Sequence, residues 1–170
     1  MPYENMVKGW LKKAHDNFSY SVKGSRQITH YNKMQDVEEH LSKFLERIKK
    51  LEEALGTIFW QFPPRFKKNV ARLEGFLDQL PDAFTYAFEF RHTSWLDDDV
   101  YDMLKQKNAA IVWQSSSMFP DDCTPTANFI YIRFYGLEGD YKYSYTPEDL
   151  RPWAKMVQKH MKRTRCIPLF

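Results

Sequence analysis

Residues 85–91 of this chain read Thr-Tyr-Ala-Phe-Glu-Phe-Arg, so an aromatic side chain stands at every second position from Tyr86 to Phe90. Because successive side chains of a β-strand point to opposite faces, this stretch predicts a strand with one aromatic face. The other face ends in two charged side chains, Glu89 and Arg91. Both the fold and the candidate site follow from this pattern of an apolar face beside a face that ends in charge.

The same alternation recurs along the chain. We predict five strands, at residues 18–23, 57–62, 85–91, 109–114 and 129–135. Amphipathic helical patterns separate or follow them, at residues 37–55, 66–80 and 97–106, and from Pro147 onward with Thr146 as the N-cap. Short strands that alternate with helices are typical of parallel α/β folds. We therefore predict a single α/β domain of barrel-type strand-helix units over residues 1–170.

The composition is that of a globular protein in a reducing compartment. Of its 170 residues, 43% are hydrophobic, which is enough for a sizeable core in one domain. The two cysteines, Cys123 and Cys166, lie far apart, unlike the dense pairs of small secreted domains. There is no run of about eighteen apolar residues and no apolar leader pattern. We expect a cytoplasmic protein with no membrane segment.

Each predicted strand ends, on its less apolar face, in a polar or charged side chain. These side chains are Lys23, Gln61, Glu89 with Arg91, Gln114 and Arg133. Parallel sheets and barrels bind ligands at the carboxyl ends of their strands, where such residues meet. Three cations around one carboxylate predict a positively biased pocket that binds an anionic small molecule or a phosphodiester. The two arginines would hold the anion bidentately, and Lys23 would act as a point charge.

Glu89 has two alternative roles in such a pocket. It is a general base if its surroundings raise its pKa, or it is the counter-ion that makes buried arginines tolerable. The second alternative includes an internal ion-pair network without chemistry. The sequence leaves both open.

Three strings of the sequence resemble the signatures of a known family. They are residues 22–30, Val-Lys-Gly-Ser-Arg-Gln-Ile-Thr-His, residues 61–64, Gln-Phe-Pro-Pro, and residues 89–95, Glu-Phe-Arg-His-Thr-Ser-Trp. Together with residues 129–136 they resemble the YecE-like proteins, also called domain of unknown function 72 (DUF72). The resemblance implies a TIM-barrel-like fold without an established activity. The matching positions and the strand-end set make up the candidate site, with ligand-binding Lys23, Arg26, Gln61, Arg91, Trp95 and Arg133 and proton-handling Glu89 and His30.

The chain departs from the family pattern at several points. Two strands that usually precede residues 18–23, and a last strand rich in aromatics and asparagines, are not recognised. Tyr135 stands where a histidine commonly precedes the glycine of the fifth strand, and an expected aspartate is replaced around Gln114. We therefore expect an incomplete TIM-barrel-like domain with about five parallel strands. Its two open sheet edges predict self-association.

Other site chemistries have little support in the sequence. A metal site is not predicted, because the inward-facing set offers only Glu89, with His30 as a further candidate. His92 has the opposite strand parity from Arg91, which favours a structural role near the helices. The common nucleotide-binding and hydrolase motifs are absent, so no cofactor is assigned.

The sequence is compatible with three functions. The first is an enzyme, or a relic of one, that binds an anionic small molecule or phosphodiester. The second is a non-catalytic nucleic-acid-binding protein that also uses cations of the helix after Thr146. The third is a structural barrel fragment with a satisfied polar interior. The irregular stretch 115–128 is long enough to be a functional loop.

Overall fold

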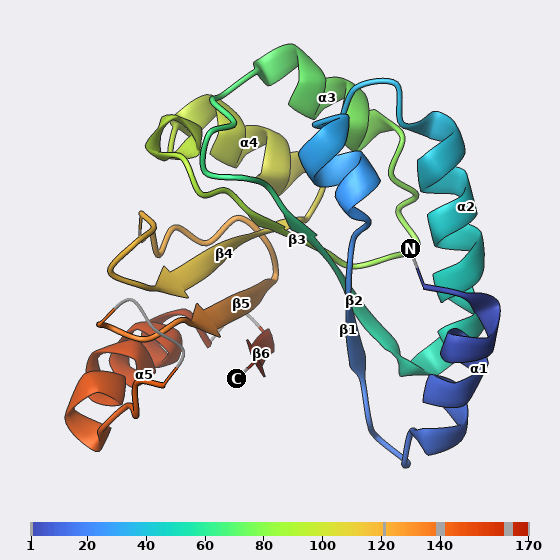
Figure 1. The fold of residues 1–170 in the computed structure, drawn as a ribbon. Coiled ribbons are helices and arrows are strands. Elements are labelled where there is room, and N and C mark those ends of the chain that lie inside the picture. Colours follow the sequence, from blue (N-terminus) through green and yellow to red (C-terminus); the bar gives the residue numbers. More distant parts are fainter. Residues whose placement is uncertain (1, 121, 139–141, 162–164, 170) are drawn as a thin grey trace.

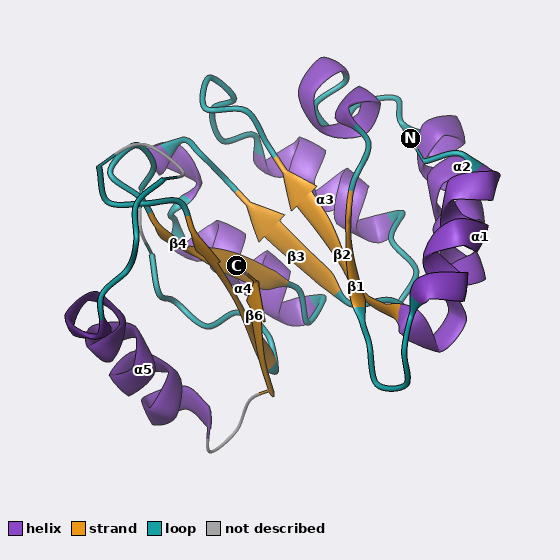
Figure 2. Ribbon diagram, turned by 60° about the horizontal axis from the view of Figure 1, so that its bottom comes forward, coloured by secondary structure: helices purple, strands orange, loops and turns teal. Residues whose placement is uncertain are grey.

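A single parallel β-sheet organises the molecule in the computed structural model, which describes residues 2–120, 122–138, 142–161 and 165–169. Its strands are β1 (Tyr20–Lys23), β2 (Leu55–Gln61), β3 (Tyr86–Glu89), β4 (Ala110–Ser115), β5 (Phe129–Phe134) and β6 (Arg165–Leu169). Each strand pairs in parallel with the next one along the chain, in the order β1-β2-β3-β4-β5-β6. Because the strands are parallel, all their carboxyl ends lie at one edge of the sheet. The sheet curls as part of a barrel (Figure 2).

Helices cover the outer face of this curl (Figure 1). The α-helices are α1 (Glu4–Lys13), α2 (Glu38–Ile48), α3 (Val70–Asp78), α4 (Asp98–Gln106) and α5 (Pro147–Met161). Short helical turns are η1 (Gln27–Tyr31), η2 (Lys49–Ala54) and η3 (Thr93–Trp95). Of the helices in the described part of the chain, none is long and apolar enough to cross a membrane.

The predicted α/β class and the partial barrel are confirmed. All five predicted strands form, with boundaries that shift by at most two residues. A sixth strand, β6, which the sequence analysis does not predict, pairs with β5. Its sequence, Arg165 to Leu169, is too short and contains a proline, so no alternation marks it.

Local capping sets the first residue of two helices. At α5 the hydroxyl of Thr146 accepts from the N–H of Asp149 (3.3 Å), and Asp149 Oδ2 accepts from the N–H of Thr146 (2.9 Å), which confirms the predicted start. The α3 helix begins only at Val70, because Asn69 Oδ1 caps it by accepting from the N–H of Arg72 (3.0 Å). The predicted helix 37–55 is α-helical only to Ile48 and continues as the η2 turn.

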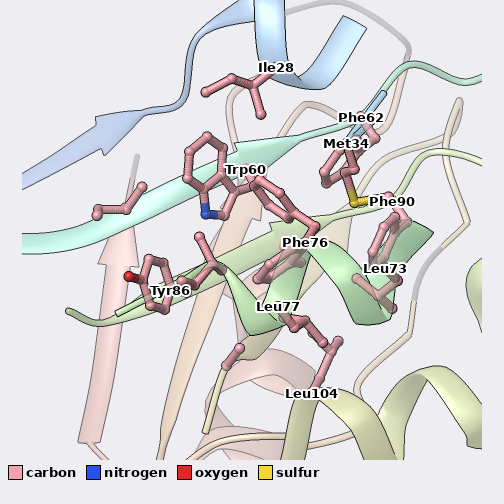
Figure 3. Packing of buried hydrophobic residues seen from close by; sticks show 14 of the residues in the cluster. Ile28, Met34, Trp60, Phe62, Leu73, Phe76, Leu77, Tyr86, Phe90 and Leu104 are labelled. Atoms are coloured by element: carbon pink, nitrogen blue, oxygen red, sulfur yellow. The ribbon is translucent and has the colours of Figure 1, made fainter. Parts of the chain in front are cut away.

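The two faces of the sheet bury different residues, as the alternation predicted. On the outer face, aromatic and aliphatic side chains of the strands pack against those of α2, α3 and α4, including Trp60, Phe76, Tyr86 and Leu104 (Figure 3). On the inner face a smaller apolar cluster forms from Phe59, Ala87, Ala110, Val112, Phe129 and Tyr131. The outer core therefore stabilises the fold, and the inner cluster forms a floor beneath the polar strand ends.

A charged cluster at the carboxyl ends of the strands

Strand register brings the inward-facing end residues together. Gln61 of β2 lies directly beside Glu89 of β3, and Gln114 of β4 lies beside Arg133 of β5. Because these strands are parallel and in register, the last inward positions of neighbouring strands fall at the same height. The predicted gathering of Lys23, Gln61, Glu89, Arg91 and Arg133 is therefore present in the structure.

Glu89 is the centre of this cluster, and its side chain is completely buried. Its Oε1 accepts from the amide of Gln61 (2.9 Å) and from Nε of Arg91 (2.7 Å). Its Oε2 accepts from Nη1 of Arg133 (2.8 Å) and from the hydroxyl of Tyr135 (2.7 Å). A carboxylate has about four lone-pair positions, so these four donors occupy all of them. Two charge-assisted contacts to arginine compensate the burial of the negative charge.

Aromatic rings hold the two arginines in place. The guanidinium of Arg91 lies 4.2 Å from the ring centroid of Phe119, and that of Arg133 lies 4.7 Å from Phe59. Both also stack near the ring of Tyr135, at 5.4 and 4.5 Å. Within the described residues, no protein acceptor engages Nη1 of Arg91 or Nε and Nη2 of Arg133. Each arginine is therefore oriented on one edge and keeps N–H donors on the other.

Tyr135 is the site residue that sequence reasoning did not include. Its hydroxyl accepts from Gln61, Arg91 and Arg133 and donates to Glu89, so it contacts four members of the cluster. Burial raises the pKa of Tyr135, and the adjacent carboxylate of Glu89 raises it further. The hydroxyl therefore stays a neutral donor. Its parity with Arg133 was visible in the sequence, but a tyrosine on a strand looks the same as a packing residue.

Lys23 and Arg26 add positive charge at the β1 side of the cluster. Nζ of Lys23 donates to Oε1 of Gln61 (2.6 Å). Burial lowers the pKa of Lys23, and the nearby Arg133 and Arg91 lower it further. Among the described residues, no carboxylate lies within ion-pair distance of Lys23 or Arg26. The charge of these two side chains is not neutralised by the protein in the way that Glu89 neutralises the arginines.

His30 follows β1 on the π-helical turn η1, a type of turn that is frequent at functional sites. Its Nδ1 lies 2.8 Å from Oγ1 of Thr29, which itself lies 3.2 Å from the carbonyl oxygen of Ser25. Because a carbonyl only accepts, the single hydroxyl proton of Thr29 points to Ser25, and Nδ1 of His30 must be the donor to Thr29. This assignment leaves Nε2 with a free lone pair in the neutral ring.

Burial and positive neighbours keep that ring neutral. Burial lowers the pKa of His30, and the charges of Arg26, Lys23 and Arg91 lower it further. Two of these charges, those of Lys23 and Arg91, belong to the strand-end cluster.

The structure does not bring Trp95 into the cluster. Its ring is fully buried, stacks on Phe90 at 4.3 Å and donates from Nε1 to the carbonyl of Phe66 (2.6 Å). Phe90 points to the outer face, so Trp95 packs on the side of the helices. His92, as predicted, has a local role there, since its Nδ1 accepts from the N–H of Ser94 (3.1 Å).

A separate cavity opens at the opposite, amino-terminal ends of the strands. Its volume is about 1270 Å³, and its wall includes Ser21, Thr57 and Phe129. The charged strand-end residues do not line it. In the described part of the chain, no group of three or more His, Cys, Asp or Glu side chains is arranged to hold a metal ion.

The family model of DUF72, described as a protein of unknown function, matches residues 1–170. This chain belongs to the DUF72 family. The YecE-like resemblance is thus confirmed, and YecE proteins of Escherichia coli strains K12 and O157:H7 are each 29% identical over 93 residues. Those 93 residues are 54% of this chain and 34% of YecE, so the match spans about a third of the length of these curated relatives.

Solved DUF72 structures share the fold. A DUF72 protein from Thermotoga maritima superposes with a TM-score of 0.85 and 26% identity, over all of this chain and 72% of its own. A DUF72 protein from Enterococcus faecalis gives a TM-score of 0.80 with 20% identity, over 98% of this chain and 72% of its own. The partial barrel of this chain therefore corresponds to most of a DUF72 structure.

Proposed function

We propose that the strand-end cluster is a binding site for a small anion that carries a phosphate or carboxylate group. The observation that supports this proposal is the imbalance of charge around Glu89. Three cationic side chains, Lys23, Arg91 and Arg133, lie in the cluster around this one carboxylate, and Arg26 adds a fourth positive charge at its β1 side. Two of them are oriented by Glu89, and the other two have no carboxylate partner among the described residues. A bound anion would offset the repulsion between them.

The arginines supply geometry and Lys23 supplies charge. Arg91 and Arg133 are 15% and 28% exposed, so their remaining N–H donors reach solvent from a largely buried base. Planar guanidinium groups suit two-point contact with carboxylate or phosphate oxygens. Because Phe119 and Phe59 already hold the two groups, little side-chain freedom is lost on binding.

Glu89 and His30 divide the two roles that the sequence left open. The carboxylate of Glu89 already accepts four hydrogen bonds, which favours the role of a counter-ion that positions the arginines. Nε2 of His30 has a free lone pair in a neutral ring, which suits it to accept a proton from a hydroxyl group or water of the bound molecule.

The test is thermal stabilisation of the intact chain by phosphate, pyrophosphate and citrate at constant ionic strength. A ligand that binds the folded state raises Tm. We expect Lys23→Met and Arg26→Met each to weaken binding on the order of tenfold, the loss of one charge-assisted contact. Lys43→Met is the matched control, because Lys43 pairs with Glu39 on the exposed surface of α2.

Two results would contradict the proposal. The first is that none of the three anions raises Tm at millimolar concentration. The second is that Lys43→Met weakens binding as much as Lys23→Met, which would mean that the anions act through general charge rather than through this site.

A further inference from the structure

Exposed apolar side chains occur in segments that follow the strands at the carboxyl edge of the sheet. In the described part of the chain, three large apolar residues on loops after the strands are well exposed, namely Tyr31 at 68%, Met118 at 54% and Leu137 at 42%. They follow β1, β4 and β5, so they lie at the carboxyl edge, where Lys23, Gln114 and Arg133 end their strands. Water contact with such side chains is unfavourable, and their position at the edge that carries the charged cluster suits a ligand with an apolar part.

Tyr31 is the best placed of the three. It ends η1 directly after His30, and the guanidinium of Arg26 lies 5.9 Å from its ring centroid. The charges of Lys23, Arg26 and Arg91 all act on His30. The exposed ring of Tyr31 therefore lies beside Arg26, which has no carboxylate partner among the described residues, and a planar group stacked on this ring would also lie beside Arg26.

The other two residues each follow or precede a residue with a defined contact at the carboxyl edge. Met118 precedes Phe119, whose ring packs on Arg91 at 4.2 Å. Leu137 follows Gly136, and the N–H of Gly136 donates to the hydroxyl of Tyr145 (3.0 Å). Tyr145 in turn donates to Oγ of Ser115 at the end of β4 (2.9 Å). The loops after β4 and β5 are thus connected to the strand ends by defined contacts.

We infer that the anion bound at the strand ends is the phosphate of a nucleotide, whose base stacks on Tyr31. This inference rests on the proposed anion site and adds the substrate class to it. Stacking on an aromatic side chain tolerates any base, because every base has a planar face. The same chemistry is offered by a free mononucleotide and by the end of a single-stranded nucleic acid.

The experiment measures dissociation constants of the intact chain for inorganic phosphate, adenosine monophosphate and a short single-stranded adenine oligonucleotide. The variants are Tyr31→Ala and Tyr31→Phe, and Tyr3→Ala is the matched control at an exposed tyrosine of the N-terminal segment. We expect the mononucleotide to bind on the order of tenfold more tightly than phosphate. Tyr31→Ala should remove this gain and leave phosphate binding unchanged, while Tyr31→Phe and Tyr3→Ala keep the gain.

Salt distinguishes the two sources of the nucleotide. A free mononucleotide should lose little affinity between low and moderate salt, whereas a strand that contacts several phosphates should lose affinity steeply. A larger oligonucleotide affinity with a steep salt slope identifies the strand as the ligand, and equal affinities with a shallow slope identify the mononucleotide.

The outcomes separate this inference from the proposed function. If phosphate binds but adenosine monophosphate binds no more tightly, the anion site stands and the nucleotide inference is wrong. The same holds if Tyr31→Ala weakens phosphate and mononucleotide equally. If neither ligand binds, the proposed function fails and the inference fails with it.

Discussion

The two faces of the same strands are stabilised in opposite ways. On the outer face Phe88 is fully buried among aromatic rings, 6.2 Å from Phe76 between ring centroids. On the inner face the next residue, Glu89, is just as buried but is surrounded by hydrogen-bond donors. Adjacent positions on one strand thus depend on apolar packing in one case and on complete polar pairing in the other. The comparison teaches that burial alone does not separate core from site.

The largest effect is expected on the outer face. Phe88→Ala should lower the free energy of unfolding by about 4 kcal/mol, because it removes a large buried side chain and leaves a cavity. Chemical denaturation of the purified variant measures this. Phosphate binding by the folded fraction should be unchanged, and a selective loss of phosphate affinity would contradict the separation of the two faces.

Glu89→Gln tests the inner face and should cost about 3 kcal/mol, because it leaves Arg91 and Arg133 partly buried without a counter-charge. Denaturation again gives the value. The double variant Glu89→Leu with Arg133→Met should recover part of the loss, since it removes both charges of one pair. If the double variant loses as much stability as the two single variants Glu89→Leu and Arg133→Met lose together, polar pairing does not stabilise this face.

The same substitution at two tyrosines sharpens the comparison within the inner face. Tyr135→Phe removes hydrogen bonds to charged groups and should cost about 2 kcal/mol. Tyr131→Phe removes only the contact with Oγ of Ser21 (2.7 Å) and should cost about 1 kcal/mol. If denaturation gives equal losses for the two variants, a hydroxyl at the charged end of the inner face contributes no more to stability than one in its apolar cluster.

The smallest effect concerns pH and His30. Its pKa in the folded protein lies below the ordinary histidine value of about 6.5, so the unfolded chain takes up the proton first as pH falls. The contribution of His30 to stability is therefore present above about pH 6.5 and is lost as pH falls through the lower folded pKa. Denaturation between pH 8 and 5 should show a flatter decline for His30→Gln than for the wild type.

The control for this titration is His15→Gln, which changes a histidine in the segment between α1 and β1. It should leave the difference between wild type and His30→Gln intact. A steeper decline for His30→Gln than for the wild type would reverse the sign and refute the role given to the surrounding cations.

The sequence predicted much of the fold and part of the site. Five strands, their inward residues and the start of α5 at Thr146 follow from local patterns, because strand alternation and helix capping depend on neighbours in the chain. Trp95 was predicted as a ligand contact, but the structure packs it between Phe90 and Phe66. Tyr135 was seen only as a departure from the family, although it contacts four members of the cluster.

Taken by itself, the sequence determined which face each strand residue occupies, because side-chain direction is set by the local backbone. Only the tertiary structure decided that Glu89 meets Arg133 and Tyr135, which lie more than forty positions away along the chain. Such contacts depend on the register of β2 to β5 and on the curl of the sheet, and neither is written in any short stretch. The four hydrogen bonds that Glu89 accepts exist only after those strands have paired.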